Sequence, residues 1–249
     1  MKALWASAAI VVVVTTSAVA ASHTSATTKA AVEKALADPA RADQAVDDAR
    51  RHAAEVLEFA GVGPGDRVVD LIPGSGYWTR ILTNVVGPKG HVVAMWPAVF
   101  AKYATKPVAA LQARGFTNVT YDVQTTIPAT VAAPVDLVWT VQNYHDVANN
   151  GAGAPALEAM DVAVFKMLKR GGAYVVIDHV DVTGAPLADG EAKHRIDPAL
   201  VKAEVLKAGF VFVGESDVLR NSADDHLRTV FDPAIRGHTD QFIYKFRKP

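Results

Sequence analysis

The stretch that decides the fold is "DLIPGSGYWT", residues 70–79. The apolar run "RVVDLI" (67–72) predicts a short buried strand, and "YWTRILTNVV" (77–86) has the apolar spacing of a helix. Between them stand Gly74 and Gly76, where a backbone without Cβ atoms can turn sharply and approach a ligand. A strand, a glycine turn and a helix in this order are typical of a nucleotide-binding turn. A tight turn without a ligand is the alternative interpretation.

The rest of the chain continues this alternation. Apolar residues at helical spacing fill 31–59, where Asp38-Pro39 predicts a break into two helices. Further strands are expected at 91–96, 118–123, 135–142, 172–179, 210–218 and 239–246, and further helices at 98–114, 155–168 and 198–209. Continuous apolar strands with helices between them indicate parallel strands covered on both faces. The sequence therefore predicts an α/β protein with a doubly wound, seven-stranded, mostly parallel sheet and N-terminal helices.

Composition restricts the partners and the chemistry. The 249 residues include 25 Lys and Arg against 26 Asp and Glu, so no basic field exists to attract nucleic acid. A small-molecule partner is expected instead. The chain has no cysteine, which excludes disulfides, thiolate metal sites and a cysteine nucleophile.

The N-terminus has the three parts of a secretory signal. Lys2 precedes an apolar run at 3–14, and Ala18-Val19-Ala20 supplies an A-x-A cleavage site. The run is shorter than the ~20 residues that a membrane-spanning helix needs. We expect a signal peptide at 1–20, a linker at 21–30 and one domain at 31–249. The mature protein would be exported, into the periplasm where the cell has an outer membrane, with no membrane contact.

Polar residues follow the predicted strands where those strands end. In a doubly wound sheet, ligands lie beyond the carboxyl ends of the strands, where the strand order reverses. These ends carry the candidate site residues: Asp70, Pro73, Gly74, Ser75, Gly76, Trp96, Asp122, His145, Asp146 and Asp178.

Three segments together resemble class I S-adenosylmethionine-dependent methyltransferases. They are "VVDLIPGSGYWTRILTNVVGPKGHVVAM" (68–95), "VDLVWTVQNYHDV" (135–147) and "LKRGGAYVVIDH" (168–179), and the resemblance covers about 50–246. The segments "HRIDPALVKAEVLKAGF" (194–210) and "TDQFIYKFRKP" (239–249) are similar to a group of exported bacterial proteins described as predicted methyltransferases. The resemblance implies a Rossmann-like fold and S-adenosylmethionine as cofactor. It also implies cofactor contacts from Asp70, residues 73–76, Trp96 and Asp122.

Two residues depart from that family's pattern. Ile72 stands where the family motif has its first glycine, and Trp96 stands where the family has an acidic residue that holds the ribose hydroxyls. A carboxylate accepts two hydrogen bonds from hydroxyls, whereas an indole can only donate one. Asp122 is near the place of an acid that often contacts adenine, but it is out of phase with it.

His145 and Asp146 resemble the His-Asp pair of small-molecule O-methyltransferases, in which the histidine takes the proton of the acceptor hydroxyl. Imidazole titrates near neutral pH and suits this role. The resemblance implies His145 as general base, with Asp146 or Asp178 as its orienting partner. A strand-end histidine that only satisfies backbone groups is the alternative.

His179 and His194 could join His145 above the same edge of the sheet, which is a set that binds divalent metals in other proteins. No H-x-x-x-H or H-x-H spacing supports a metal site, and none is predicted. Asp197 before Pro198 is instead typical of a helix start.

Three functions fit these observations. The first is methyl transfer from S-adenosylmethionine to a small acceptor. The second is an exported protein of the same fold without methyl transfer, with a binding or other enzymatic role in the same cleft. An NAD-dependent dehydrogenase ranks last. The acidic residue after the second strand is missing, and Thr79 stands where the dinucleotide-binding motif has its third glycine.

Overall fold

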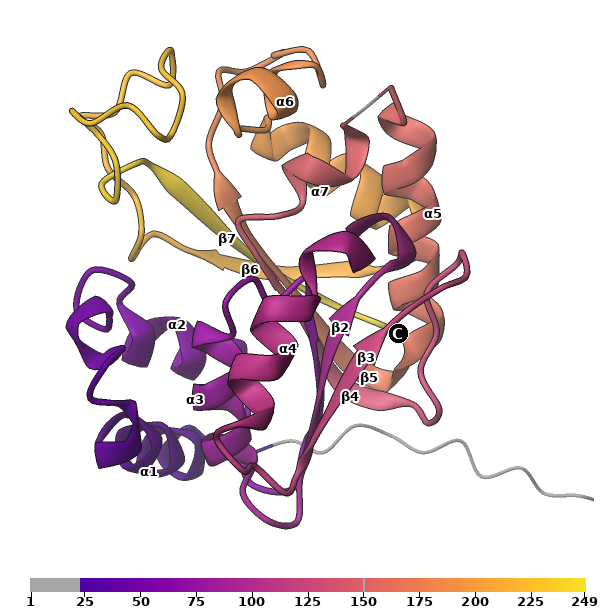
Figure 1. Ribbon diagram of the computed structural model, residues 1–249. Helices are drawn as coiled ribbons and strands as arrows, with labels where there is room; N and C mark the ends of the chain where they lie inside the picture. The colour runs from indigo at the N-terminus through magenta and orange to yellow at the C-terminus, as the bar shows by residue number, and fades with distance from the viewer. Residues whose placement is uncertain (1–22, 150) are drawn as a thin grey trace, which may run out of the picture.

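A computed structural model describes residues 23–149 and 151–249 of the chain (Figure 1). Seven strands form one sheet in the order β3-β2-β1-β4-β5-β7-β6, and β7 runs antiparallel to both of its neighbours. The other adjacent pairs are parallel, so the predicted sheet is confirmed. The strands are β1 (Arg67–Leu71), β2 (His91–Trp96), β3 (Val119–Val123), β4 (Val135–Val141), β5 (Leu168–His179), β6 (Val211–Ser216) and β7 (Gln241–Arg247).

Helices cover both faces of the sheet (Figure 1). Buried side chains of α1, α2 and α3 form one core with one face of the central strands, and those of α5 and α7 form the other core. The helices are α1 (Ser25–Leu36), α2 (Ala53–Ala60), α3 (Tyr77–Val86), α4 (Thr105–Gln112), α5 (Gly153–Met167), α6 (Asp189–Lys193) and α7 (Pro198–Lys207). Short 3-10 helices are η1 (Pro39–Arg41), η2 (Ala45–Asp47), η3 (Ala98–Tyr103) and η4 (His145–Ala148).

The N-terminal segment differs from the expected linker at 21–30. Helix α1 already begins at Ser25, because the Thr24 hydroxyl accepts a hydrogen bond from the backbone N–H of Thr27 and caps the first turn. The predicted signal peptide lies outside the described residues. Within the part of the chain that the structure describes, no helix has the length and apolar character to cross a membrane.

The helix predicted at 98–114 is divided into η3 and α4. Pro107 explains the division, since it has no N–H to donate to the carbonyl of Tyr103 and its ring would collide with that carbonyl. The helix therefore restarts at Thr105 and has Pro107 in its first turn.

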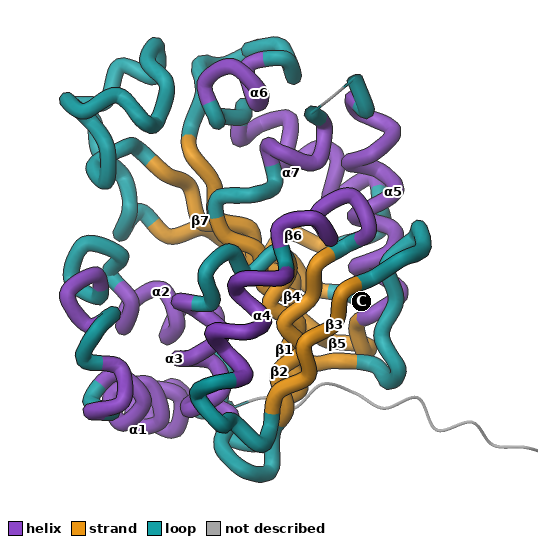
Figure 2. The backbone as a smooth tube through the Cα atoms, viewed as in Figure 1, coloured by secondary structure: helices purple, strands orange, loops and turns teal. Residues whose placement is uncertain are grey.

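The strand order reverses between β1 and β4, which are hydrogen-bonded neighbours in the sheet. Loops at the carboxyl ends of these two strands diverge to opposite sides, and such a crevice is the usual ligand site of a doubly wound sheet. The loop between β6 and β7, residues 217–240, rises at the same end of the molecule (Figure 2).

Candidate functional site

The glycine turn connects β1 to α3 as predicted. Gly74 and Gly76 have φ values of +56° and +84°, a region that suits glycine. A Cβ on Gly76 would lie 2.7 Å from the side chain of Leu111 in α4, whereas a Cβ on Gly74 would meet nothing within 4 Å. Gly76 thus permits close packing against α4, and Gly74 borders open space. Pro73 and Ser75 lie beside it on the same turn.

Asp70 fixes the start of this turn. Its carboxylate is 2% exposed and accepts a hydrogen bond of 2.6 Å from the hydroxyl of Thr79 in α3. Burial raises the pKa of Asp70 to about 7, and the Thr79 hydrogen bond only partly opposes this shift. The side chain therefore ties the strand to the helix.

Ile72 keeps the backbone conformation of the glycine that it replaces. Its φ is +58°, in the left-handed region that β-branched residues rarely adopt. The backbone is held on both sides, because Ile72 N–H donates to Met95 and its carbonyl accepts from the Asn143 side chain at 2.9 Å. Its own side chain is buried in the core cluster beside α5. Packing and hydrogen bonds thus maintain a strained backbone here.

Trp96 and Asp122 do not supply the missing carboxylate. The Trp96 side chain is 1% exposed and packs in a small cluster with Ala94, Ala104 and Leu111. Asp122, in β3, accepts a hydrogen bond from the Gln124 side chain. Trp96 borders the large cavity described next, but Asp122 does not line it.

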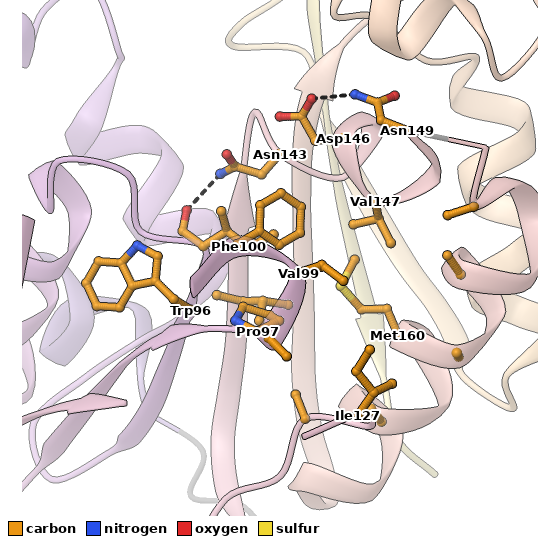
Figure 3. A pocket seen from close by; sticks show the side chains of 18 of the residues that line it. Trp96, Pro97, Val99, Phe100, Ile127, Asn143, Asp146, Val147, Asn149 and Met160 are labelled. Carbon is orange, nitrogen blue, oxygen red and sulfur yellow. Dashed lines mark hydrogen bonds between the residues drawn. The ribbon is translucent and has the colours of Figure 1, made fainter. Parts of the chain in front are cut away.

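Two hollows meet at the carboxyl end of β1. The smaller, about 150 Å³, lies over the glycine turn and is bordered by Arg51, Asp70 and Ser75. The larger, about 890 Å³, extends beneath η3 to α5 and has mainly apolar walls (Figure 3). The two hollows share Ile72, Gly74 and Asn143 as lining residues. A ligand on the turn would therefore be next to a ligand in the cavity.

A histidine cluster lies at the polar end of the large cavity. His145 is 2% exposed, and its Nδ1 is 2.8 Å from Oδ1 of Asp178, whose Oδ2 accepts the His145 backbone N–H. His145 Nε2 lies 3.1 Å from Nδ1 of His194, a residue at the end of α6. Asp146 and His194 line the cavity, whereas His145 lies behind them.

Charge balance in this cluster favours the ion pair between His145 and Asp178. Burial by itself lowers the pKa of His145, but the carboxylates of Asp178 and Asp146 together outweigh it, so the pKa is raised. Burial likewise opposes the ionised form of Asp178, but the neighbouring imidazoles hold its pKa below the usual value. Asp178 therefore holds the His145 ring and backbone by hydrogen bonds, and Asp146 lies on the other side of the ring.

His179 does not join this cluster. Its Nδ1 is 2.8 Å from the hydroxyl of Thr239, and burial lowers its pKa to about 4, so that the ring is neutral at pH 7. Asp197 accepts the backbone N–H of Ala199 as the N-cap of α7, which confirms its prediction as a helix start.

Known proteins with a similar chain or structure include several methyltransferases. The family model of protein-L-isoaspartate(D-aspartate) O-methyltransferase matches residues 23–123, which contain the glycine turn and β1 to β3. The structure of the N-methyltransferase NodS from Bradyrhizobium japonicum with S-adenosyl-L-homocysteine is 15% identical over 90% of this chain and 99% of that chain, with a TM-score of 0.57.

An S-adenosylmethionine-dependent methyltransferase from Mesorhizobium loti is 18% identical over 83% of this chain and 99% of that chain, with a TM-score of 0.54. The chain has the class I methyltransferase fold. The [4+2]-cyclase SpnF is also similar, with 17% identity over 93% of this chain and 99% of that chain and a TM-score of 0.56.

Within this methyltransferase fold, the structure brings together most of the site residues predicted from the sequence. Asp70, Pro73, Gly74, Ser75 and Trp96 border the hollows, whereas Gly76 and Asp122 do not. His145, Asp146 and Asp178 form one cluster. The sequence offers His194 only as one of three histidines that could converge, and it predicts neither a metal site nor a catalytic role for this residue. His194 lies far along the chain from His145, so no local spacing could have revealed the contact.

Proposed function

We propose that this protein is an S-adenosylmethionine-dependent methyltransferase that acts on a small-molecule acceptor. The observation that carries the proposal is the junction of the two hollows at Ile72, Gly74 and Asn143. A cofactor above the glycine turn and an acceptor in the apolar cavity would be in contact there. Bound S-adenosylmethionine would supply an electrophilic methyl group on its sulfonium sulfur.

The smaller hollow fits the amino-acid end of this cofactor. Gly74 leaves open space, and Ser75 is exposed beside it. Arg51 borders the same hollow, and its buried Nε has no hydrogen-bond partner within the described residues. A carboxylate of the ligand would satisfy that donor. The ribose end of the cofactor fits less well, because the Trp96 indole at the end of β2 cannot accept hydrogen bonds from the ribose hydroxyls.

The larger cavity indicates a mainly apolar acceptor with one polar group. Its walls include Val99, Phe100, Ile127 and Met160, while Asp146 and Asn149 lie at a polar end (Figure 3). His194 also lines the cavity there, with its Nδ1 3.6 Å from Asp146 Oδ1. An acceptor would bury its apolar body against these walls and place a hydroxyl at the polar end.

His194 can serve as general base, supported by His145 and Asp178, when no other ligand occupies the cluster. His194 lines the cavity, and its Nδ1 contacts Nε2 of His145, whose Nδ1 contacts Asp178. A proton taken from an acceptor hydroxyl by His194 would be shared along this chain of hydrogen bonds. In this arrangement His194 touches the acceptor, and His145 and Asp178 position it and stabilise its charge.

Export remains part of the proposal and is supported by the sequence of residues 1–20. The second candidate function is a protein of this fold that has lost methyl transfer. Ile72 in place of glycine and Trp96 in place of an acid favour it. A cyclase, SpnF, is among the similar structures, so the fold alone does not fix the reaction.

Calorimetric titration with S-adenosylmethionine and S-adenosylhomocysteine tests the first function. We expect saturable 1:1 binding that is lost in Gly74→Ala, whose Cβ would project into the open space beside the turn that the ligand would occupy. Gly115→Ala is the matched control, because Gly115 also has a positive φ, of +71°, and open space around it, but lies outside the site. No binding at millimolar ligand would favour the second function, whereas equal loss in both variants would contradict the placement of the cofactor over the glycine turn.

A further inference from the structure

Three ligand-type atoms of the histidine cluster face one another. His145 Nε2 lies 3.1 Å from His194 Nδ1 and 3.4 Å from Asp146 Oδ1. His194 Nδ1 lies 3.6 Å from the same Asp146 oxygen. The three atoms therefore form a nearly equilateral triangle. Within residues 23–149 and 151–249, this is the one group of three histidine or carboxylate residues with such a spacing.

The size of the triangle matches a tetrahedral metal centre. Bonds of about 2.0–2.1 Å from zinc to nitrogen or oxygen, at tetrahedral angles, place neighbouring ligand atoms about 3.3–3.4 Å apart. The distances in the cluster, 3.1, 3.4 and 3.6 Å, span that range. An ion could therefore enter with shifts of a few tenths of an ångström.

The outer contacts are those of a supported metal site. His145 has its second ring nitrogen, Nδ1, against the fully buried Asp178 carboxylate at 2.8 Å. A carboxylate in this position fixes the tautomer with the lone pair on Nε2, which is the nitrogen that faces the triangle. Asn149 donates a hydrogen bond of 2.8 Å to Asp146 Oδ1 and orients that carboxylate.

His194 is held in place from two sides. It ends α6 with a φ of +57°, and its ring packs edge-to-face on Phe231 of the loop between β6 and β7, with ring centroids 4.7 Å apart. Gly190 allows α6 to approach η4, because a Cβ there would lie 2.8 Å from the carbonyl oxygen of His145. The tertiary structure thus brings the third ligand to the other two.

We propose that His145 Nε2, His194 Nδ1 and Asp146 Oδ1 bind a divalent first-row metal ion of the zinc class. Two imidazoles and one carboxylate form a ligand set of catalytic zinc sites, in which a fourth position stays open. Asp146 and His194 line the large cavity, so the open position faces it. An acceptor hydroxyl bound there would lose its proton more readily.

This last role, but not the metal binding itself, rests on the proposed methyl transfer. A metal ligand cannot also act as a base with the same lone pair. In the metal-bound protein His145 and His194 are therefore ligands, and the base role described above belongs to the metal-free protein.

Calorimetry with Zn²⁺ alone tests the site. The full chain is stripped with a chelator and titrated with Zn²⁺, and Co²⁺ is added separately to record the intense visible absorption of tetrahedral coordination. We expect one ion per chain. His194→Ala should weaken Zn²⁺ binding at least 100-fold, and Asp178→Asn, which removes only an outer contact, by about 10–100-fold.

His226→Ala is the matched control. His226 also pairs with a carboxylate, 3.0 Å from Asp240, but belongs to no group of three in the described chain. The His226→Ala variant should bind Zn²⁺ as tightly as the unaltered protein. Circular dichroism checks that each variant is folded. No saturable binding, or equal weakening by His194→Ala and His226→Ala, would overturn the proposal.

The two proposals fail separately. Zn²⁺ binding without any binding of S-adenosylmethionine would keep the metal site and remove the methyl-transfer function. The reverse result would overturn the metal site alone.

Discussion

The glycine turn at 72–76 comes from one continuous segment, whereas the cluster of His145, Asp146 and His194 joins residues up to 49 positions apart. The turn is bounded by a strand and a helix that adjoin it in the chain. The cluster needs β4, β5 and α6 to be placed correctly before its side chains meet. A local site can therefore lose its usual residues and keep its shape, whereas a dispersed site depends on packing elsewhere.

Ile72 and Gly190 illustrate the contrast. Ile72 departs from the residue that the turn favours, yet the backbone keeps a φ of +58° because neighbouring strands hold it. Gly190 touches neither a proposed ligand atom nor the turn, yet it sets how closely α6 can approach His145. The three predictions below test this difference, in order of decreasing effect.

The largest effect is expected at Gly190. In Gly190→Ala the new Cβ would overlap the His145 carbonyl oxygen, so α6 must move away at a cost of about 1–3 kcal/mol in unfolding free energy. Zn²⁺ affinity should fall with it, because His194 ends α6, while S-adenosylmethionine affinity should not change. Urea unfolding and calorimetry measure these effects.

Gly214→Ala in β6 is the control, since a Cβ there would meet nothing within 4 Å. Its stability should stay within about 0.5 kcal/mol of the unaltered protein. Equal effects of the two substitutions would show that α6 does not control the cluster.

The next effect concerns Ile72. Because its φ is positive, Ile72→Gly should be more stable than Ile72→Ala by about 1–2 kcal/mol. At Val69, in the middle of β1, the order should reverse, with alanine more stable than glycine by about 0.5–1 kcal/mol. Urea unfolding of the four variants gives both differences. If alanine were more stable than glycine at both positions, the backbone at Ile72 would not be strained.

The smallest effect is a pH dependence from Asp70. Its pKa is about 7 in the folded protein, above the unfolded value of about 3.9, so the folded state holds the proton more tightly. Stability from this group is therefore lost as pH rises from about 4 to about 7. When the pH is raised from 5 to 6, the unfolding free energy of Asp70→Asn should fall by about 1 kcal/mol less than that of the unaltered protein. Parallel curves of unfolding free energy against pH would contradict the shift.

Much of the fold could be predicted because its signals are local. Alternating apolar strands and helices, with the turn at Gly74 and Gly76, indicated the seven-stranded sheet. The sheet topology also placed Asp178 near His145, because the carboxyl ends of adjacent parallel strands lie at one edge, but the sequence left Asp146 and Asp178 as alternative partners of this histidine. The start of α1 at Ser25 was missed, since its polar residues carry weak periodicity and the Thr24 cap decides the boundary.

The sequence by itself determined the α/β architecture, the glycine turn and the two strand ends that carry His145 and Asp178, because these depend on neighbouring residues and on sheet topology. Only the tertiary structure decided that Trp96 is nearly fully buried at the edge of the large cavity and that His194 completes a triangle with His145 and Asp146. The physical reason is that α6 reaches η4 through packing at Gly190, a contact between segments that no spacing within either one specifies.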